Sequence, residues 1–276
     1  MKYDIGTSNR LGNRKSNQDR LSIVESGSAV LLVVADGMGG HACGDLAAEA
    51  TVDCAIREFN NAQNPVRNPV DFVKNIILHA HHDVVTLASI YKPPLKTRTT
   101  CVICMIQEGV AYWAHVGDSR LYLIRDGAVI GRTVDHSRVE ELYQQGKITE
   151  AQKHRHPERN LVTQCIGSRS YGPQPTLSEP YPLQEDDVLL LCSDGLWGAL
   201  NEQHIVESVR KGDLITAVDA LSFDAEHASY PHADNISVAA IRWLSSPASG
   251  AVEPDSDIDS SLASEIKNIY SMATKK

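Results

Sequence analysis

The sequence has 276 residues, of which 42% are hydrophobic and 22% charged, and its formal net charge is −9. This length suits one large domain or two small ones, and it is sufficient for a sizeable buried core. An acidic chain of ordinary composition argues against general binding to nucleic acids or to anionic membranes.

No targeting or membrane segment is predicted. The first residues, MKYDIGTSNRLGNRK, lack the apolar core of a signal peptide, and no apolar run approaches the roughly 20 residues of a membrane span. Six cysteines in a chain of this length do not indicate a disulfide scaffold. We therefore expect reduced thiols and a cytoplasmic protein.

The first third predicts one buried strand and two helices. AVLLVVAD, residues 29–36, is a continuous apolar run typical of a strand buried on both faces. Residues 44–59 form a predicted helix, in which Ala47, Ala50 and Cys54 recur at helical spacing. Asn68 is a predicted N-cap with Pro69 at the first position of the next helix. The apolar face of that helix comprises Val73, Ile76, Ile77, Ala80, Val84 and Leu87.

The rest of the chain is richer in strands. Residues 99–130 predict three short strands, with turns at Glu108-Gly109 and Asp126-Gly127. Cys101 and Cys104 have C-x-x-C spacing, but they lie in a predicted strand and lack a second pair for zinc. The polar residues 135–160 predict one short helix, which ends near Gly146.

Two more strands are predicted at residues 187–194 and 236–244, with a helical region between them at about residues 202–221. Strands near both ends that enclose helices favour an α+β layered domain over a repeated βαβ unit. From Ser245 the chain is rich in Ser, Pro and Asp, which predicts a disordered tail with one weak helical stretch at 262–269.

Aspartates stand at the ends of several predicted strands. Asp36 and Asp194 each end an apolar run and are each followed by glycine, whereas Asp19 and Asp234 precede strands. A buried carboxylate is costly unless a cation or hydrogen-bond donors compensate it. A bound metal is the simplest solution, and oxygen-only ligands select hard cations such as Mg²⁺ or Mn²⁺. Gly37 would let its backbone carbonyl approach such an ion closely.

Other interpretations of these residues remain open at this point. Asp-Gly pairs also form ordinary turns. The glycines of DGMGGHACGD, residues 36–45, are also typical of a phosphate-binding loop, but the segment matches neither the P-loop nor the G-x-G-x-x-G pattern. The histidines without metal-ligand spacing, for which we expect structural roles, are His115, His136, His154 and His156.

Several motifs then occur in a characteristic order along the chain. They are RKSNQD (14–19), VVADGMGGH (33–41), TT (99–100), AHVGDSRLYLIRDG (114–127), TVDHS (133–137), RNLVTQCIG (159–167), LLLCSDGLW (189–197) and DNISV (234–238). With these motifs, residues 6–243 resemble the metal-dependent type 2C protein serine/threonine phosphatases in their compact bacterial form.

The resemblance implies a four-layer α-β-β-α sandwich, in which helix pairs flank two antiparallel sheets. It implies a phosphatase domain at residues 1–244, with a flap at about 135–160 that influences substrate choice, and a tail at 245–276. Replacement of residues 140–150 is expected to alter activity on phosphoproteins but to spare a small aryl phosphate.

The resemblance also implies the site residues. Two Mn²⁺ or Mg²⁺ ions would share Asp36, with the carbonyl of Gly37 on one ion and with Asp194 and Asp234 on the other. Asp19 would contribute to the same site, partly through water, and Asp118 would help to hold a third ion. Arg14 would grip the substrate phosphate, and Asn235 would orient water. The implied catalytic residues are Arg14, Asp36, Asp194 and Asp234.

The implied reaction is hydrolysis of phosphoserine or phosphothreonine by a metal-activated water, opposing a cognate serine/threonine kinase. We expect a monomer that acts on phosphoproteins, without nucleic-acid or membrane partners. Two departures stand out, because Met38 replaces a histidine proposed as general acid in eukaryotic members and Gln18 replaces a common glutamate. The alternatives are a pseudophosphatase scaffold and a partner-switch phosphatase that acts on a small regulatory protein.

Overall fold

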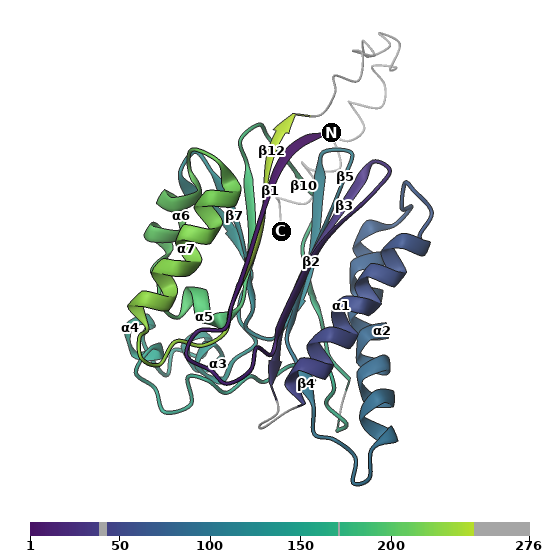
Figure 1. The fold of residues 1–276 in the computed structure, drawn as a ribbon, viewed down its shortest axis with the longest axis vertical. Coiled ribbons are helices and arrows are strands. Elements are labelled where there is room, and N and C mark those ends of the chain that lie inside the picture. Colours follow the sequence, from purple (N-terminus) through teal and green to yellow (C-terminus); the bar gives the residue numbers. More distant parts are fainter. Residues whose placement is uncertain (39–42, 171, 246–276) are drawn as a thin grey trace, which may run out of the picture. The chain divides into compact units, whose positions relative to one another are not determined.

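Two antiparallel β-sheets face each other at the centre of the molecule (Figure 1). The computed structural model describes residues 1–38, 43–170 and 172–245. The five-stranded sheet has the order β1 (Lys2–Arg10), β12 (Ile236–Ser245), β11 (Val188–Cys192), β7 (Arg120–Arg125) and β8 (Ala128–Arg132).

The second sheet has seven strands. Its main order is β10 (Tyr181–Pro182), β6 (Val110–Val116), β5 (Cys101–Gln107), β3 (Ala29–Met38) and β2 (Asp19–Ser26). Two short strands complete it, since β4 (Arg98–Thr99) pairs with β3 and β9 (Thr176–Leu177) pairs with β6.

Helices cover both outer faces of this sandwich (Figure 1). The seven-stranded sheet packs against α1 (Gly44–Asn61) and α2 (Pro69–Ile90). The five-stranded sheet packs against α5 (Asp194–Trp197), α6 (Glu202–Val209) and α7 (Leu214–Ala228). The predicted α+β architecture, a four-layer sandwich with two antiparallel sheets and flanking helices, is confirmed.

β3 shows why its sequence is apolar without interruption. Leu31 and Val33 pack under α1 and α2, whereas Leu32 and Val34 pack against the other sheet. Alternate side chains of a strand point to opposite faces, so a strand between two cores needs apolar residues at every position. The prediction of a strand buried on both faces is confirmed.

The predicted start of α2 is also confirmed. The side-chain oxygen of Asn68 accepts a hydrogen bond from the backbone N–H of Asp71 at 3.3 Å, and Pro69 is the first helical residue. The cysteine prediction holds as well, because all six cysteines are free and five of them, Cys54, Cys101, Cys104, Cys165 and Cys192, are buried.

Two predictions of secondary structure differ from the structure, and a glycine lies at a division in each. The segment predicted as three strands contains β4 to β8: Gly117, with a φ of 102°, lets the chain cross from β6 in one sheet to β7 in the other, and Thr100 separates β4 from β5. The single helical region predicted near residues 202–221 is divided into α6 and α7 at Gly212, whose φ is 83°. Positive φ values suit glycine, which has no Cβ.

No described helix has both the length and the apolar character needed to span a membrane. Met1–Ser245 forms one compact unit. The prediction of a disordered tail concerns residues 246–276, which lie outside the described residues.

Candidate active site

The predicted carboxylates lie at or beside strand ends, in segments that include the start of α5 and the part of β3 next to β4. Figure 1 labels both α5 and β4. Asp19 and Asp36 are direct partners in the β2–β3 ladder. Asp194 follows β11 as the first residue of α5, and Asp234 precedes β12. Asp118 lies in the crossing between β6 and β7. We call these five residues the carboxylate cluster.

The main chain of Asp36 is held from both sides. Its N–H donates to the hydroxyl oxygen of Thr100 at 3.0 Å, and its carbonyl accepts from the N–H of Thr100 at 2.9 Å and from the Thr99 hydroxyl at 2.8 Å. The hydroxyls of Thr100 and Ser119 lie 2.6 Å apart, and Ser119 follows Asp118 directly. The two threonines therefore fix Asp36 relative to the crossing that carries Asp118.

Asp19 is joined to the start of α5 through Ser193. The Ser193 hydroxyl donates to Oδ2 of Asp19 at 2.7 Å and accepts from the N–H of Ser237 at 2.9 Å. The side chain of Asp19 is almost fully buried, and its residue is 1% exposed. One serine hydroxyl thus connects β2, β12 and the residue next to Asp194.

Gly37 and Gly195, which follow Asp36 and Asp194, lie where main chains approach each other closely. A Cβ on Gly37 would stand 2.2 Å from the carbonyl oxygen of Gly44, at the start of α1. A Cβ on Gly195 would stand 2.1 Å from the carbonyl oxygen of Asn235. Neither φ is positive, so the absence of a side chain, and not backbone conformation, is what the fold requires here.

Arg14 contacts the carboxylate cluster from a loop between β1 and β2. Its guanidinium donates to Oδ2 of Asp234 at 2.5 Å, and this bond raises the pKa of Arg14. The side chains are 58% and 37% exposed, so the pair faces solvent. Arg14 is therefore placed beside the carboxylates with its guanidinium open to an incoming anion.

Asn235 fastens that loop. Its side-chain oxygen accepts from the N–H of Gln18 at 2.9 Å, and its amide nitrogen donates to the carbonyls of Leu11 at 2.9 Å and Ser16 at 3.1 Å. These three bonds position the segment that carries Arg14. The predicted role of Asn235 in orienting water stays a prediction.

The carboxylates raise one another's pKa values. Burial is the largest cause and raises the pKa of Asp19 to about 7, of Asp118 to about 8 and of Asp194 to about 6. The pKa of Asp36 is raised well above its usual range by burial and then by the charges of the other four aspartates. A divalent cation at this position would favour the ionised forms.

The donor set fits a hard cation, because it consists of carboxylates with the Gly37 carbonyl beside them and no sulfur or imidazole ligand. In the described part of the chain, no three His, Cys, Asp or Glu side chains already stand as a finished metal site. The structure therefore brings the predicted donors together, and coordination would need some of their side chains to turn.

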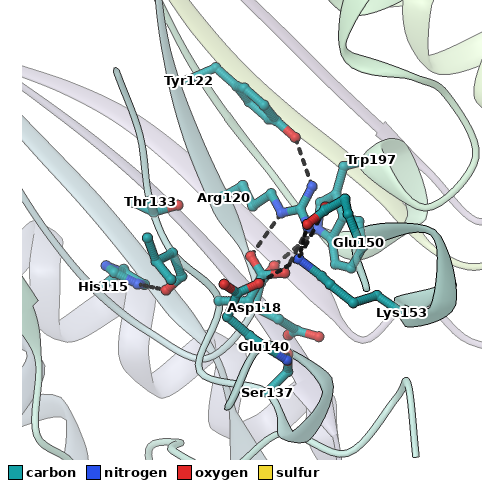
Figure 2. Close-up of polar contacts among 12 residues, drawn as sticks. His115, Asp118, Arg120, Tyr122, Thr133, Ser137, Glu140, Glu150, Lys153 and Trp197 are labelled. Carbon is teal, nitrogen blue, oxygen red and sulfur yellow. Dashed lines mark hydrogen bonds and ion pairs between the residues drawn. The ribbon is translucent and has the colours of Figure 1, made fainter. Parts of the chain in front are cut away.

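Asp118 belongs to a second network, which sequence reasoning missed (Figure 2). The Trp197 indole N–H donates to the carbonyl of Asp118 at 2.9 Å, and the Arg120 guanidinium stacks 3.6 Å from the Trp197 ring centroid. Arg120 also forms two hydrogen bonds to Asp135, at 2.8 and 2.6 Å. This stack joins the Asp118 crossing, α5 and the start of the predicted flap. The sequence offered one indication of this network, because Arg120 is a charged residue in a buried strand two positions after Asp118.

The predicted flap contains two short helices, α3 (Arg138–Gln144) and α4 (Glu150–Lys153), of which only the first was predicted. Figure 2 shows their connection. The ammonium of Lys153 lies 2.5 Å from Glu140 and 3.2 Å from Glu150, and both Lys153 and Glu140 are buried. An internal ion pair, which the polar sequence did not reveal, fastens α3 to α4.

The histidines contact protein groups, as expected for structural residues. His115 and His136 stack with ring centroids 4.5 Å apart, and the Nε2 of His115 lies 2.8 Å from the Val134 carbonyl. Burial, and then the neighbouring His115, lowers the pKa of His136 to about 4. Both rings are therefore neutral near pH 7 and serve to pack the base of the flap.

Comparison with known proteins agrees with this fold. The family model described as protein phosphatase 2C matches residues 5–221. A protein phosphatase 2C-type protein of Streptococcus pyogenes is 34% identical over 209 residues, which is 75% of this chain and 81% of that protein. The serine/threonine phosphatase stp of Listeria monocytogenes is 30% identical over 228 residues, which cover 82% and 89% of the two chains.

Among solved structures, the serine/threonine phosphatase of Streptococcus agalactiae matches with a TM-score of 0.79 and 30% identity, over 87% of this chain and 99% of that one. The sandwich thus has a counterpart in a solved serine/threonine phosphatase. This chain belongs to the protein phosphatase 2C family.

Proposed function

We propose that this protein phosphatase hydrolyses phosphoserine and phosphothreonine in proteins at the carboxylate cluster, using divalent metal ions. The observation that carries the proposal is the convergence of five aspartates, whose charges raise the pKa of Asp36 at their centre, beside the exposed guanidinium of Arg14. Relatives named serine/threonine phosphatase support the choice of substrate.

Each carboxylate has a proposed part in holding Mn²⁺ or Mg²⁺. Asp36, the Gly37 carbonyl, Asp194 and Asp234 would hold a pair of ions between them. Asp19 would contribute to the same site, and Asp118 would help to hold a third ion. When bound, such ions supply a nucleophile at neutral pH by making water more acidic.

The protein's own residues bind and orient the phosphate. A guanidinium forms two parallel hydrogen bonds with a phosphoryl group, so Arg14 is suited to hold the substrate and to offset charge on its oxygens. To do so it exchanges its bond with Asp234 for the phosphate. Met38 is a thioether and cannot donate a proton, so the leaving oxygen takes its proton from water or from another group, and no residue is assigned as general acid.

We also propose the compartment, the opposing enzyme and the oligomeric state. Six free cysteines fit a reducing compartment, so we place the enzyme in the cytoplasm, where it opposes a serine/threonine kinase as a monomer. Residues 1–244 form the proposed phosphatase domain and 245–276 a tail. A scaffold without activity and a partner-switch phosphatase are the alternatives that the experiment below separates.

The test is hydrolysis of a phosphothreonine peptide with Mn²⁺, Mg²⁺ or a chelator, for the wild type and Asp194→Asn. We expect turnover that needs metal and is lost in the variant, while circular dichroism shows both proteins folded. A folded wild type without activity under any metal would favour the scaffold. Activity restricted to a small regulatory protein would favour the partner switch.

A further inference from the structure

A cavity of about 500 Å³ adjoins the carboxylate cluster on the side of the flap. Asp194 and Trp197 of α5 form one wall, and Lys153 of the flap forms another. Arg120 and Arg132 come from the edge of the five-stranded sheet. Asp194 is a member of the carboxylate cluster and also lines this cavity. A peptide whose phosphorylated residue binds at the cluster would therefore place its neighbouring side chains beside the cavity.

The five-stranded sheet places Arg120 and Arg132 on the same face. Arg132 of β8 is the ladder partner of Tyr122 in β7, and Tyr122 lies two residues after Arg120. Directly opposed residues and residues two apart share a face of a sheet, so all three point to the side covered by α5 and α6. Tyr122 accepts a hydrogen bond from Arg120 at 3.1 Å, which agrees with this placement.

Some of the positively charged side chains that line the cavity already form ion pairs with protein carboxylates, and others do not. Arg120 is bound to Asp135, and Lys153 to Glu140, and Figure 2 shows both cations on this side of the flap. The guanidinium groups of Arg132 and Arg159 make no hydrogen bond or ion pair with any described residue. Arg132 is partly buried, and withdrawal of a charge from water is costly without a partner.

From these observations we propose that the cavity binds an anionic side chain of the substrate near the phosphorylated residue, with Arg132 as the residue that selects it. The inference rests on the proposed function. A glutamate, an aspartate or a second phosphoryl group has the same chemistry toward a guanidinium, which binds two oxygens of either group at once. Arg159, exposed at the rim, adds a second positive charge.

The test compares phosphothreonine peptides whose flanking residues are alanine, except for one glutamate, phosphoserine or lysine placed at each neighbouring position in turn. For the wild type, kcat/KM should rise about tenfold when an anion occupies one particular position, which is the expected effect of a hydrogen-bonded charge pair. Lysine at that position should lower kcat/KM.

Arg132→Gln should abolish this preference, and Arg132→Glu should reverse it in favour of lysine. Arg159→Gln should weaken the preference, which keeps the test informative if an Arg132 variant unfolds. Arg155→Gln is the matched control, because Arg155 is an exposed flap arginine that lines a different hollow. All variants should hydrolyse a small aryl phosphate at the wild-type rate.

An equal anion preference in wild type and both arginine variants would overturn the proposal, and so would the absence of any preferred position. A preference for phosphoserine over glutamate would assign the cavity to doubly phosphorylated substrates, and equal effects would assign it to acidic sequences. A wild type that does not hydrolyse the aryl phosphate would instead refute the proposed function. Failure of the proposed function can therefore be distinguished from failure of the cavity proposal.

Discussion

The two Asp-Gly pairs of this protein share a sequence and differ in backbone structure. Asp36-Gly37 lies inside β3, which continues to Met38, whereas Asp194-Gly195 begins α5 after β11 has ended. In both cases the glycine brings its main chain against another main chain, at Gly44 or Asn235. The repeated dipeptide therefore marks a carboxylate beside a close backbone approach, and not a repeated element of secondary structure.

The two aspartates also differ in their electrostatic surroundings. The pKa of Asp36 is raised by burial and by the charges of all four other carboxylates of the cluster. The pKa of Asp194 is raised less, to about 6, because Arg14 and a hydrogen bond with Asp36 act in the opposite direction. Asp36 is thus the centre of the cluster, and Asp194 lies on its Arg14 side.

The largest expected effects are on Mn²⁺ binding and on kcat, and Mn²⁺ binding should distinguish Asp36 from Asp194. Asp36→Asn should abolish binding of both proposed Mn²⁺ ions, whereas Asp194→Asn should leave one. Each variant should lose about a thousandfold in kcat, since metal stabilisation of a phosphoryl transition state contributes several kcal/mol. Isothermal titration with Mn²⁺ gives the stoichiometry, and hydrolysis of a phosphothreonine peptide gives the rate.

Asp135→Asn serves as a control for removal of a nearby carboxylate, because Asp135 binds Arg120 and is not a proposed metal ligand. It should retain the full Mn²⁺ stoichiometry. Identical stoichiometry in Asp36→Asn and Asp194→Asn would show that Asp36 is not the shared ligand.

The two glycines should be similarly intolerant of a side chain. Gly37→Ala and Gly195→Ala would each place Cβ within 2.2 Å of a backbone carbonyl oxygen. Such overpacking costs about 1–3 kcal/mol or more, because main chain cannot move aside as a side chain can. We expect Tm to fall by about 2–4 °C per kcal/mol for a chain of this size, measured by thermal unfolding.

Gly172→Ala is the matched control, because no atom lies within 4 Å of its added Cβ and its φ is not positive. Its Tm should stay close to that of the wild type. A similar fall in Tm for all three variants would mean that the two close contacts are not the cause, since alanine acting on the unfolded chain alone would raise Tm.

In the metal-free protein, stability should fall as pH rises. The folded pKa values of Asp19, Asp118 and Asp194 are about 7, 8 and 6, all above the unfolded value of about 3.9. The folded state therefore holds more protons between pH 4 and 8, so the free energy of unfolding decreases across this window. Urea unfolding in chelator at several pH values measures the slope.

Added Mn²⁺ should reverse this trend, because the ions bind the ionised carboxylates. The rise in Tm with Mn²⁺ should be larger at pH 8 than at pH 6. Asp194→Asn removes one of the titrating groups and should flatten the slope in chelator. A slope that is the same in both proteins would contradict the raised pKa of Asp194.

Local patterns predicted an α+β layered domain with carboxylates at its strand ends, and the resemblance to a known family supplied the sandwich. The apolar run of β3, the Asn68-Pro69 helix start and the aspartates at strand ends each follow from burial, capping or charge within a few residues. The motif resemblance then assigned parts to Arg14 and Asp118 that spacing alone left open.

What the sequence did not predict depends on contacts between distant segments. The stack of Arg120 on Trp197 joins residues 77 positions apart, and the pair of Lys153 and Glu140 is buried only because α3 and α4 fold together. β1 was also missed, because its partner β12 lies at the other end of the described chain. Such pairings have no periodic signal within either segment.

The smallest expected effect on the chemical step concerns the flap. The structure changes the design of this experiment, because Glu140 and Glu150 both contact Lys153, and their replacement would leave that buried ammonium unpaired. Replacement of residues 145–148, which lie between α3 and α4, with a Gly/Ser linker keeps both helices and the ion pair and removes only the connecting chain.

We expect this variant to lose about tenfold in kcat/KM toward a phosphoprotein and to keep the wild-type rate on a small aryl phosphate. The reason is that none of residues 145–148 belongs to the carboxylate cluster, whereas the segment lies between residues that line the adjoining cavity. Lys153→Met provides the contrast, because it leaves Glu140 buried without its cation and should lower Tm as well. Equal losses on both substrates in the linker variant would mean that the flap supports the cluster itself and does not choose the substrate.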